Sequence, residues 1–434
     1  QFANKEAIAY FTRALRLVAE RDTSRRLSLL LARARLYHLR GEREEELADL
    51  AEMSRLADKE GALYWQAMVA LRRAAYARAV GNHQETVTWA ETAVKQAQSD
   101  RQPALEAEGY LHWAWGLLGL GRYDEARPLL EKAHTLAQTH DLPQIEADSL
   151  RNLGFIPWQQ GNYDEARLYF AQALSVHQQV GDKAGESAAL NNLGLVARQQ
   201  NDYQAARKQY LKSIHIKREI GDRRGEGTTL NNLGYVCWIE GDMAAARHYY
   251  EQSLQIKEEI QDKPGLTTTL TNLGLAAFGL GDYEAARNYY EQALTINQQI
   301  GNRQIEGLIW ENLSLLFHYL GEQEKARSYA QQALKLALEL DARERQAFAL
   351  TNLGHALTAL NDYQQARMVY EQALVIRRDL RQHNLEMESL AGLARVALAE
   401  HKLAEAQTCA ELIWGHLQSG TLEGTDDPYR IYLT

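Results

Sequence analysis

The chain has 434 residues, of which 24% are charged and 45% are hydrophobic, and its formal net charge is −9. This acidity argues against a protein that coats nucleic-acid backbones, for which a basic stripe is expected. No run of about 18 apolar residues and no signal peptide are present, so we expect neither a membrane span nor secretion. The two cysteines, Cys237 and Cys409, stand far apart and indicate a reducing, cytoplasmic compartment without a disulfide framework.

A small residue recurs every 40 positions along nearly the whole chain. Asn-Leu-Gly triplets at 152–154, 192–194, 232–234, 272–274 and 352–354 fix the register. The residue after the Leu position is then always small: Ala34, Ala74, Ala114, Gly154, Gly194, Gly234, Gly274, Ser314, Gly354 and Ala394. A fixed period of this length predicts a solenoid, in which each unit buries its apolar face only by stacking on its neighbours.

Taken in chain order, residues 1–21 predict a half repeat, the second helix of a truncated unit. Residues 22–421 follow as an array of ten units, and residues 422–434 as the start of a truncated further repeat or a tail. The pattern is weakest in 22–101, where Glu46 and Thr86 replace the alanine that the second helix carries elsewhere.

The first helices of 22–101 are rich in arginine: Arg33, Arg35, Arg40, Arg72, Arg73 and Arg78. Such a charge run is usually a solvated face. It could also dock an adjoining domain or an acidic partner. Both interpretations stay open.

The unit 222–261 illustrates the expected local structure. Apolar residues recur at helical spacing on both sides of Gly241-Asp242, which predicts two antiparallel helices of about 17 residues joined by a tight turn. Gly241 suits a left-handed residue that ends the first helix, and Asp242 suits the N-cap of the second. We expect Gly234 and Ala246 to let the two backbones approach closely, and Tyr250 to fill the seam to the next repeat.

The pattern Leu-x-x-Leu-Gly … Gly-x-Tyr-x-x-Ala … Tyr-x-x-Ala resembles the tetratricopeptide repeat. The period is 40 in place of the more common 34, and the longer form is similar to the arrays of kinesin light chains and of bacterial signal-transduction ATPases. The resemblance implies an all-α, right-handed superhelical solenoid of about ten 40-residue helix-turn-helix units, with the first helices lining a concave groove. The joint Ile-Gly-Asp-Arg-Arg-Gly-Glu at 220–226 is similar to arrays that follow the nucleotide-binding module of maltose-regulator-like and related STAND proteins.

The residue before the Leu position is asparagine in six consecutive units: Asn152, Asn192, Asn232, Asn272, Asn312 and Asn352. In the family, this asparagine faces the groove and holds the main chain of a bound peptide. A row of amides offers donors and acceptors that suit an extended backbone. The alternative is that each asparagine bonds the neighbouring repeat and fixes its geometry.

Around this row, Trp158, Tyr235, Trp238 and Phe278 are candidates to hold apolar groups of a ligand, or else they belong to the core between helices. Arg198 and Arg151 are the only obvious cations beside the row. We therefore do not expect a ligand held by its C-terminal carboxylate.

The sequence predicts a binding surface and no enzyme. No His-Glu-x-x-His motif, phosphate loop or nucleophile motif is present, so we expect neither catalysis, nor a metal, nor a cofactor. The resemblance implies a sensor arm of a bacterial STAND signal-transduction ATPase that binds a peptide, a protein or a small inducer in its concave groove, beside a nucleotide-binding module. The alternative is a stand-alone adaptor between proteins. The acidity disfavours an RNA-binding repeat, and we expect neither nucleic acid nor membrane as partner.

Overall fold

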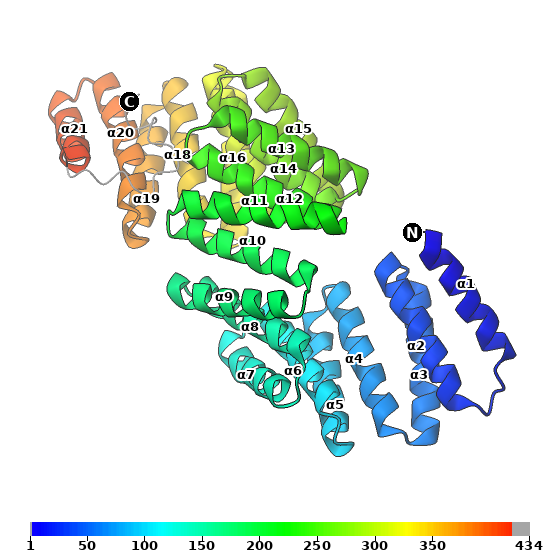
Figure 1. Cartoon of the computed structure of the whole chain (residues 1–434). Coiled ribbons are helices and arrows are strands. Elements are labelled where there is room, and N and C mark those ends of the chain that lie inside the picture. The colour runs from blue at the N-terminus through cyan, green and yellow to red at the C-terminus, as the bar shows by residue number, and fades with distance from the viewer. Residues whose placement is uncertain (1, 419–434) are drawn as a thin grey trace. The chain divides into compact units, whose positions relative to one another are not determined.

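The computed structural model describes residues 2–418, which form helices connected by short turns, with no strand in that range (Figure 1). The predicted beginning of a further repeat at 422–434 lies outside the described residues. The helices are α1 (Phe2–Leu17), α2 (Thr23–Arg40), α3 (Arg43–Glu60), α4 (Leu63–Ala79), α5 (His83–Ser99), α6 (Pro103–Gly119), α7 (Tyr123–Thr139), α8 (Pro143–Gln159), α9 (Tyr163–Gln179), α10 (Lys183–Gln199), α11 (Tyr203–Ile220), α12 (Arg223–Ile239), α13 (Met243–Glu259), α14 (Lys263–Gly279), α15 (Tyr283–Ile300), α16 (Arg303–Tyr319), α17 (Gln323–Glu339), α18 (Arg343–Ala359), α19 (Tyr363–Asp379), α20 (His383–Ala399) and α21 (Leu403–Gln418).

The chain divides into two compact units, residues 1–222 and residues 223–434. From α2 onwards, each even-numbered helix is the first helix of a repeat and the following odd-numbered helix is the second. Within each unit, every helix packs on the next one in the chain. The prediction of an all-α solenoid of helix-turn-helix repeats is confirmed.

The first helices form the inner side of each unit. In unit 1, α4 also contacts α6, and α6 also contacts α8; in unit 2, α14 contacts α16 and α16 contacts α18. The second helices of neighbouring repeats do not pack on one another to a comparable extent among the described residues. Because the first helices lie closer together, each unit curves toward them, and their exposed side chains face the concave side.

The turn inside each repeat follows the predicted chemistry. Gly241 has a φ of 80°, and the N–H of Asp242 donates to the Cys237 carbonyl at 2.9 Å, which closes the helix end. The Asp242 carboxylate then accepts from the Ala245 N–H at 3.0 Å and caps α13. Asn201, Asn361 and His401 hold the same left-handed conformation in other repeats, with φ values of 60–63°.

The small residue of each first helix makes room for a ring from the second helix of the same repeat. A Cβ on Gly274 would lie 2.3 Å from Cε1 of Tyr290, and a Cβ on Gly234 2.7 Å from Cε1 of Tyr250. The same Cβ on Gly234 would lie 3.2 Å from the carbonyl oxygen of Ala246. The predicted close approach of the two backbones is therefore only part of the reason for a glycine at this position. The glycine is required mainly because the ring occupies the space of a side chain.

This pairing extends through the array. The five glycines at the position each meet an aromatic ring 16 residues later: Gly154 with Phe170, Gly194 with Tyr210, Gly234 with Tyr250, Gly274 with Tyr290 and Gly354 with Tyr370. Where the small residue is alanine, the residue 16 positions later is smaller than these rings, as in the buried pair Ala114 and Leu130. The ring also meets the next repeat as predicted, since Tyr370 lies against Gly392 of α20.

The Gly274–Tyr290 pair predicts a reversal of sign in a double-mutant cycle. Gly274→Ala should destabilise the wild-type chain by about 1–2 kcal/mol, because the ring of Tyr290 must move. In a Tyr290→Leu background, the same change should stabilise by up to about 1 kcal/mol, because alanine has the higher helix propensity and no longer meets a ring. Urea unfolding of the four proteins measures both values. Equal stabilisation in the two backgrounds would contradict the assigned packing.

A buried polar residue near the end of several second helices reaches the start of the next helix. Lys257 is 4% exposed, and its Nζ donates to the Gly265 carbonyl at 3.1 Å and to Thr269 Oγ1 at 2.8 Å. Burial lowers the pKa of Lys257 to about 8, although the charge of Asp262 acts in the opposite direction. Buried polar side chains stand at the same repeat position elsewhere: His177, Lys217, Asn297 and Arg377.

Lys257 therefore predicts a pH dependence of stability. Its pKa is about 8 in the folded chain, against an ordinary value of 10.5 for a solvated lysine. Between these values the unfolded chain binds more protons, so the free energy of unfolding rises with pH. We expect Lys257 to contribute a rise of about 1–2 kcal/mol between about pH 8 and pH 9.5. The measure is the difference between the wild type and Lys257→Met in urea unfolding at both pH values. The control is Lys212→Met, which removes an exposed lysine and should leave the rise in unfolding free energy unchanged. If Lys257→Met also leaves this rise unchanged, the lowered pKa is wrongly assigned to Lys257.

Candidate functional site

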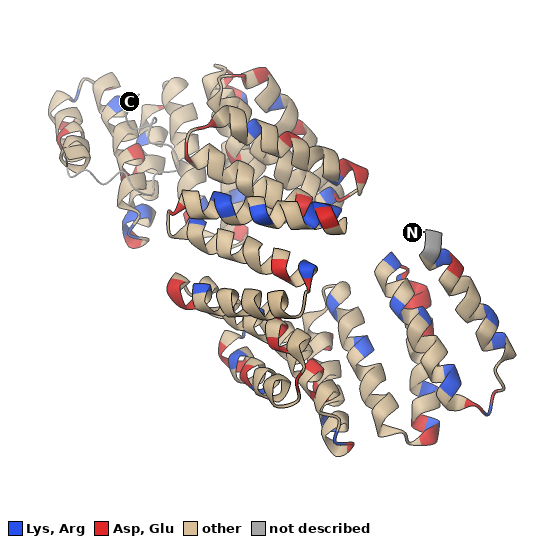
Figure 2. Cartoon of the chain, viewed as in Figure 1, with Lys and Arg blue, Asp and Glu red and all other residues tan. Residues whose placement is uncertain are grey.

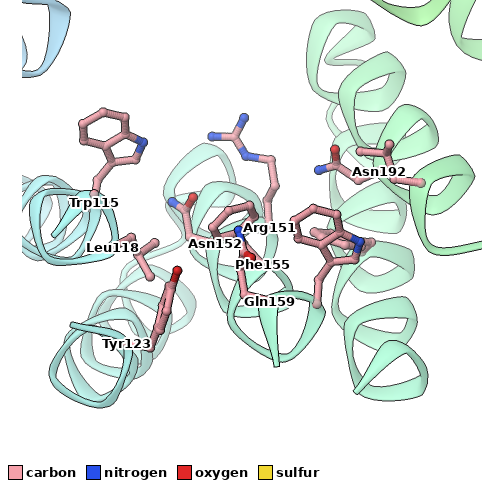
Figure 3. A pocket seen from close by; sticks show the side chains of 12 residues that line it. Trp115, Leu118, Tyr123, Arg151, Asn152, Phe155, Gln159 and Asn192 are labelled. Atoms are coloured by element: carbon pink, nitrogen blue, oxygen red, sulfur yellow. The ribbon is translucent and has the colours of Figure 1, made fainter. Parts of the chain in front are cut away.

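Three successive first helices of unit 1 surround a pocket of about 430 Å³. The lining comes mainly from α6, α8 and α10, with one residue each from α7 and α9. The lining residues are Trp115, Leu118, Gly119, Tyr123, Arg151, Asn152, Phe155, Trp158, Gln159, Phe170, Asn192 and Leu195. Figure 3 shows Trp115 and Leu118 on one side, Asn152 and Phe155 in the middle and Asn192 on the other side.

The wall of the pocket is aromatic and aliphatic. The rings of Phe155 and Trp158 pack against each other with centroids 5.5 Å apart, one turn apart on α8. The ring of Trp115 packs against the ring of His83, with the two centroids 5.4 Å apart. Phe170 closes the wall beside Gly154, which leaves space for its ring. Such a wall suits an apolar side chain of a ligand.

Several polar groups at the pocket have no partner in the protein. The side-chain amides of Asn152 and Asn192 make no hydrogen bond with any residue in 2–418, and Trp158 Nε1 is buried without an acceptor. Arg151 is ion-paired with Asp148 at 2.9 Å, but its buried Nε has no acceptor. Figure 3 shows the Arg151 guanidinium extending from α8 into the space between Trp115 and Asn192 in this view. The pocket therefore offers amide donors and acceptors, an indole N–H and one positive charge above an apolar wall.

The asparagines of unit 2 are bonded differently. Asn272 Nδ2 donates to Asn231 Oδ1 at 3.2 Å, and Asn352 Nδ2 donates to the Glu311 carbonyl at 3.1 Å. Each bond reaches 41 residues back, to the preceding repeat. Asn312 Nδ2 is buried without an acceptor in the described part of the chain, and Asn232 is half-buried on α12. Asn272 and Asn352 therefore join repeats, whereas Asn152 and Asn192 face a pocket. That the asparagine row binds a ligand stays a prediction.

The other predicted site residues separate in the same way. Trp158 lines the pocket, whereas Arg198 lies on α10 outside its lining. Tyr235 and Trp238 stack on each other in unit 2 with centroids 5.7 Å apart. Phe278 meets the ring of Tyr319 at 5.2 Å and borders a core cluster. These three aromatic residues are half-buried and in contact with the core.

Sequence reasoning missed Trp115, Leu118 and Tyr123. Trp115 is three residues after His112, the counterpart of Asn152 one repeat earlier, and so occupies the position of Phe155. Extending the repeat register by one unit toward the N-terminus would have identified it. The asparagine row did not indicate this repeat, because the position equivalent to Asn152 is a histidine there.

Within residues 2–418, no three His, Cys, Asp or Glu side chains are grouped so that they could hold a metal ion. No helix in the described part of the chain is long and apolar enough to cross a membrane.

Family models of the tetratricopeptide repeat match residues 109–132, 145–219, 225–299, 265–339 and 349–383, which together make up more than half of the chain. The chain belongs to the tetratricopeptide repeat family. No curated protein matches it in sequence.

Solved structures share the fold at low sequence identity. One of them is a signal transduction ATPase with numerous domains (STAND) from Pyrococcus horikoshii, which has a tetratricopeptide repeat sensor. Its TM-score is 0.63 at 15% identity, over 96% of this chain and 66% of its own. The apo quorum sensor NprR from B. thuringiensis has a TM-score of 0.60 and 15% identity, over 82% of this chain and 99% of its own. The apo form of RapI has a TM-score of 0.61 and 14% identity, over 82% of this chain and 98% of its own. At these identities, the likeness establishes the fold.

The two kinds of asparagine predict different effects on stability. Asn272→Ala should destabilise unit 2 by about 1 kcal/mol, because Asn231 loses a donor. Asn152→Ala should change the stability of unit 1 by less than about 0.5 kcal/mol, because its side-chain amide has no partner among the described residues. Hydrogen exchange of the amides in α12–α15 and in α6–α9 measures each effect locally. Equal losses of protection in the two variants would contradict the distinction.

Proposed function

We propose that this chain is a ligand-binding arm that takes a peptide, a protein segment or a small inducer into the pocket between α6, α8 and α10. The observation that carries the proposal is the unpaired state of Asn152, Asn192 and Trp158 Nε1 above an apolar wall. Two amides on successive repeats present donors and acceptors about one repeat apart, which suits the backbone of an extended peptide. The volume of about 430 Å³ is large enough for an aromatic side chain with part of its backbone.

We further propose that the arm is the sensor of a STAND signalling ATPase in the cytoplasm. The array of the Pyrococcus horikoshii STAND protein is described as a sensor, and it matches nearly all of this chain in fold. In this arrangement, binding of the ligand to the array would change the activity of a nucleotide-binding module elsewhere in the full-length protein. The chain by itself would bind ligand without signalling, and the array would contribute recognition and no catalysis.

The competing function is a stand-alone adaptor that holds two proteins together. The coding sequence next to this chain separates the two. A Walker motif upstream supports the sensor, whereas a gene that encodes only the repeats favours the adaptor. This comparison does not depend on the identity of the ligand.

Asn152→Ala combined with Asn192→Ala should weaken ligand binding. The probe is a pool of fluorescein-labelled peptides of about ten residues, each with one Trp, Phe or Leu at the centre. We expect the dissociation constant of the pool to rise by a factor that corresponds to about 1–3 kcal/mol, because polar groups of the bound peptide lose their partners. Fluorescence anisotropy measures binding, and circular dichroism checks that the helices are retained.

The matched control is Asn272→Ala combined with Asn352→Ala, which changes the same residue type where it joins repeats. This variant should bind the pool as the wild type does. If the wild type binds no peptide of the pool, or if both double variants bind equally well, the peptide pocket is wrong.

A further inference from the structure

The arginines of the first repeats are not equivalent in the structure. Arg33 is bound on both sides of its guanidinium by Asp49, at 2.9 Å and 2.6 Å, and Arg40 pairs with Glu42 at 2.6 Å. Arg73 lies over the ring of Trp89 on α5, 4.7 Å from its centroid. These three are therefore occupied by contacts within or between helices.

The remaining arginines follow the inner positions of α2, α4 and α8. Arg35, Arg72, Arg78 and Arg151 form what we call the arginine strip. In Figure 2, α4 carries basic residues and no acidic residue, in agreement with its sequence. Arg78 lies over the ring of Trp115, 5.2 Å from its centroid, so the strip runs directly into the wall of the pocket.

The members of the strip are close enough to influence one another. The pKa of Arg72 is lowered by burial, and the charge of Arg35 adds to this effect while that of Glu108 opposes it. The pKa of Arg78 is lowered by burial and by the charge of Arg151, while the charges of Asp148 and Glu108 oppose this effect. His112 lies between them; burial and then the charges of Arg78 and Arg72 lower its pKa to about 3. His112 is thus neutral near pH 7 and adds no charge of its own.

The carboxylates near the strip do not balance it. Glu108 pairs with Arg72 at 3.2 Å, and Asp148 pairs with Arg151 at 2.9 Å. Arg35 and Arg78 have no carboxylate within ion-pair distance among residues 2–418. The strip therefore contains two guanidiniums without an ion pair in the described residues, in a chain whose formal net charge is −9.

This excess has a consequence for the ligand. An anionic group of a ligand placed beside Arg78 or Arg35 would pair with a guanidinium that has no ion pair within the described residues. The neighbouring pocket takes an apolar side chain and supplies amides for a peptide backbone. A ligand that uses both features carries an apolar residue with acidic residues to one side.

We propose that the pocket and the arginine strip together bind an acidic peptide segment, whose apolar side chain enters the pocket beside Trp115 and whose carboxylates lie along Arg78 and Arg35 toward α2. The proposal rests on the peptide pocket proposed above and specifies its ligand and the direction in which it lies. A nucleic-acid strand suits the strip less well, because it carries a phosphate at every nucleotide and would also meet Glu108 and Asp148, whereas a peptide can place its carboxylates only beside Arg78 and Arg35.

Two peptide pools test the proposal. Both consist of fluorescein-labelled peptides of about ten residues with a central Trp, Phe or Leu. The acidic pool has Asp and Glu at the positions on one side, and the amide pool has Asn and Gln at the same positions. We expect the acidic pool to bind about three- to tenfold more tightly at about 50 mM salt, and the preference to disappear at about 500 mM salt.

Arg35→Gln combined with Arg78→Gln should abolish this preference and leave the affinity for the amide pool unchanged. The matched control is Arg13→Gln combined with Arg16→Gln, which removes the same charge from exposed residues of α1. The control should keep the preference. An oligothymidylate of similar length serves as a third probe and should bind more weakly than the acidic pool.

The possible outcomes separate the two proposals. Equal binding of both pools, with loss of binding in the Asn152→Ala, Asn192→Ala variant, overturns the acidic ligand and supports the peptide pocket. An unchanged preference in the Arg35→Gln, Arg78→Gln variant also overturns the role of the strip. Stronger binding of the oligothymidylate overturns it in favour of nucleic acid. If neither pool binds, both proposals fail.

Discussion

The repeat depends on one contact, in which a glycine on the first helix meets an aromatic ring on the second helix. Tyr290 is 1% exposed and stands where a Cβ on Gly274 would be. The ring fixes the distance and the register of the two helices at once, because it fits only opposite the glycine. The ring can also contact the next repeat, as Tyr370 contacts Gly392. One pair therefore sets the geometry both within a repeat and between repeats.

That geometry decides where a ligand can go. Since first helices pack on first helices, their free faces come together on the inner side of each unit. In unit 1 this brings Trp115, Phe155 and Asn192, from three repeats, to one pocket. The side-chain amides of Asn152 and Asn192 make no hydrogen bond within the described residues, whereas those of Asn272 and Asn352 join repeats in unit 2. The same residue type at the same repeat position thus lies in two different environments, which its neighbours determine.

The distribution of charge is as informative as the pocket. Averaged over the chain, acidic residues prevail, and this average is what argues against nucleic acid. Locally, the first repeats place arginines on the inner face and leave Arg35 and Arg78 without a carboxylate in the described structure. The local charge on the inner face of the first repeats therefore differs in sign from the average charge of the chain.

The sequence by itself determined the fold class, the repeat length and the position of nearly every turn. These features depend on residues a few positions apart, such as Gly241 before Asp242, or on a period that repeats ten times. It also indicated the asparagine row and the arginine-rich first helices as candidates for binding. What it left open was which members of each set are free. Asn152 and Asn272 occupy equivalent positions in the repeat, yet of these two side-chain amides only that of Asn272 has an acceptor within residues 2–418. Arg33 and Arg35 lie two residues apart, yet only Arg33 meets a carboxylate. Only the tertiary structure decides such differences, because a hydrogen bond or an ion pair depends on what a neighbouring repeat places within about 3 Å.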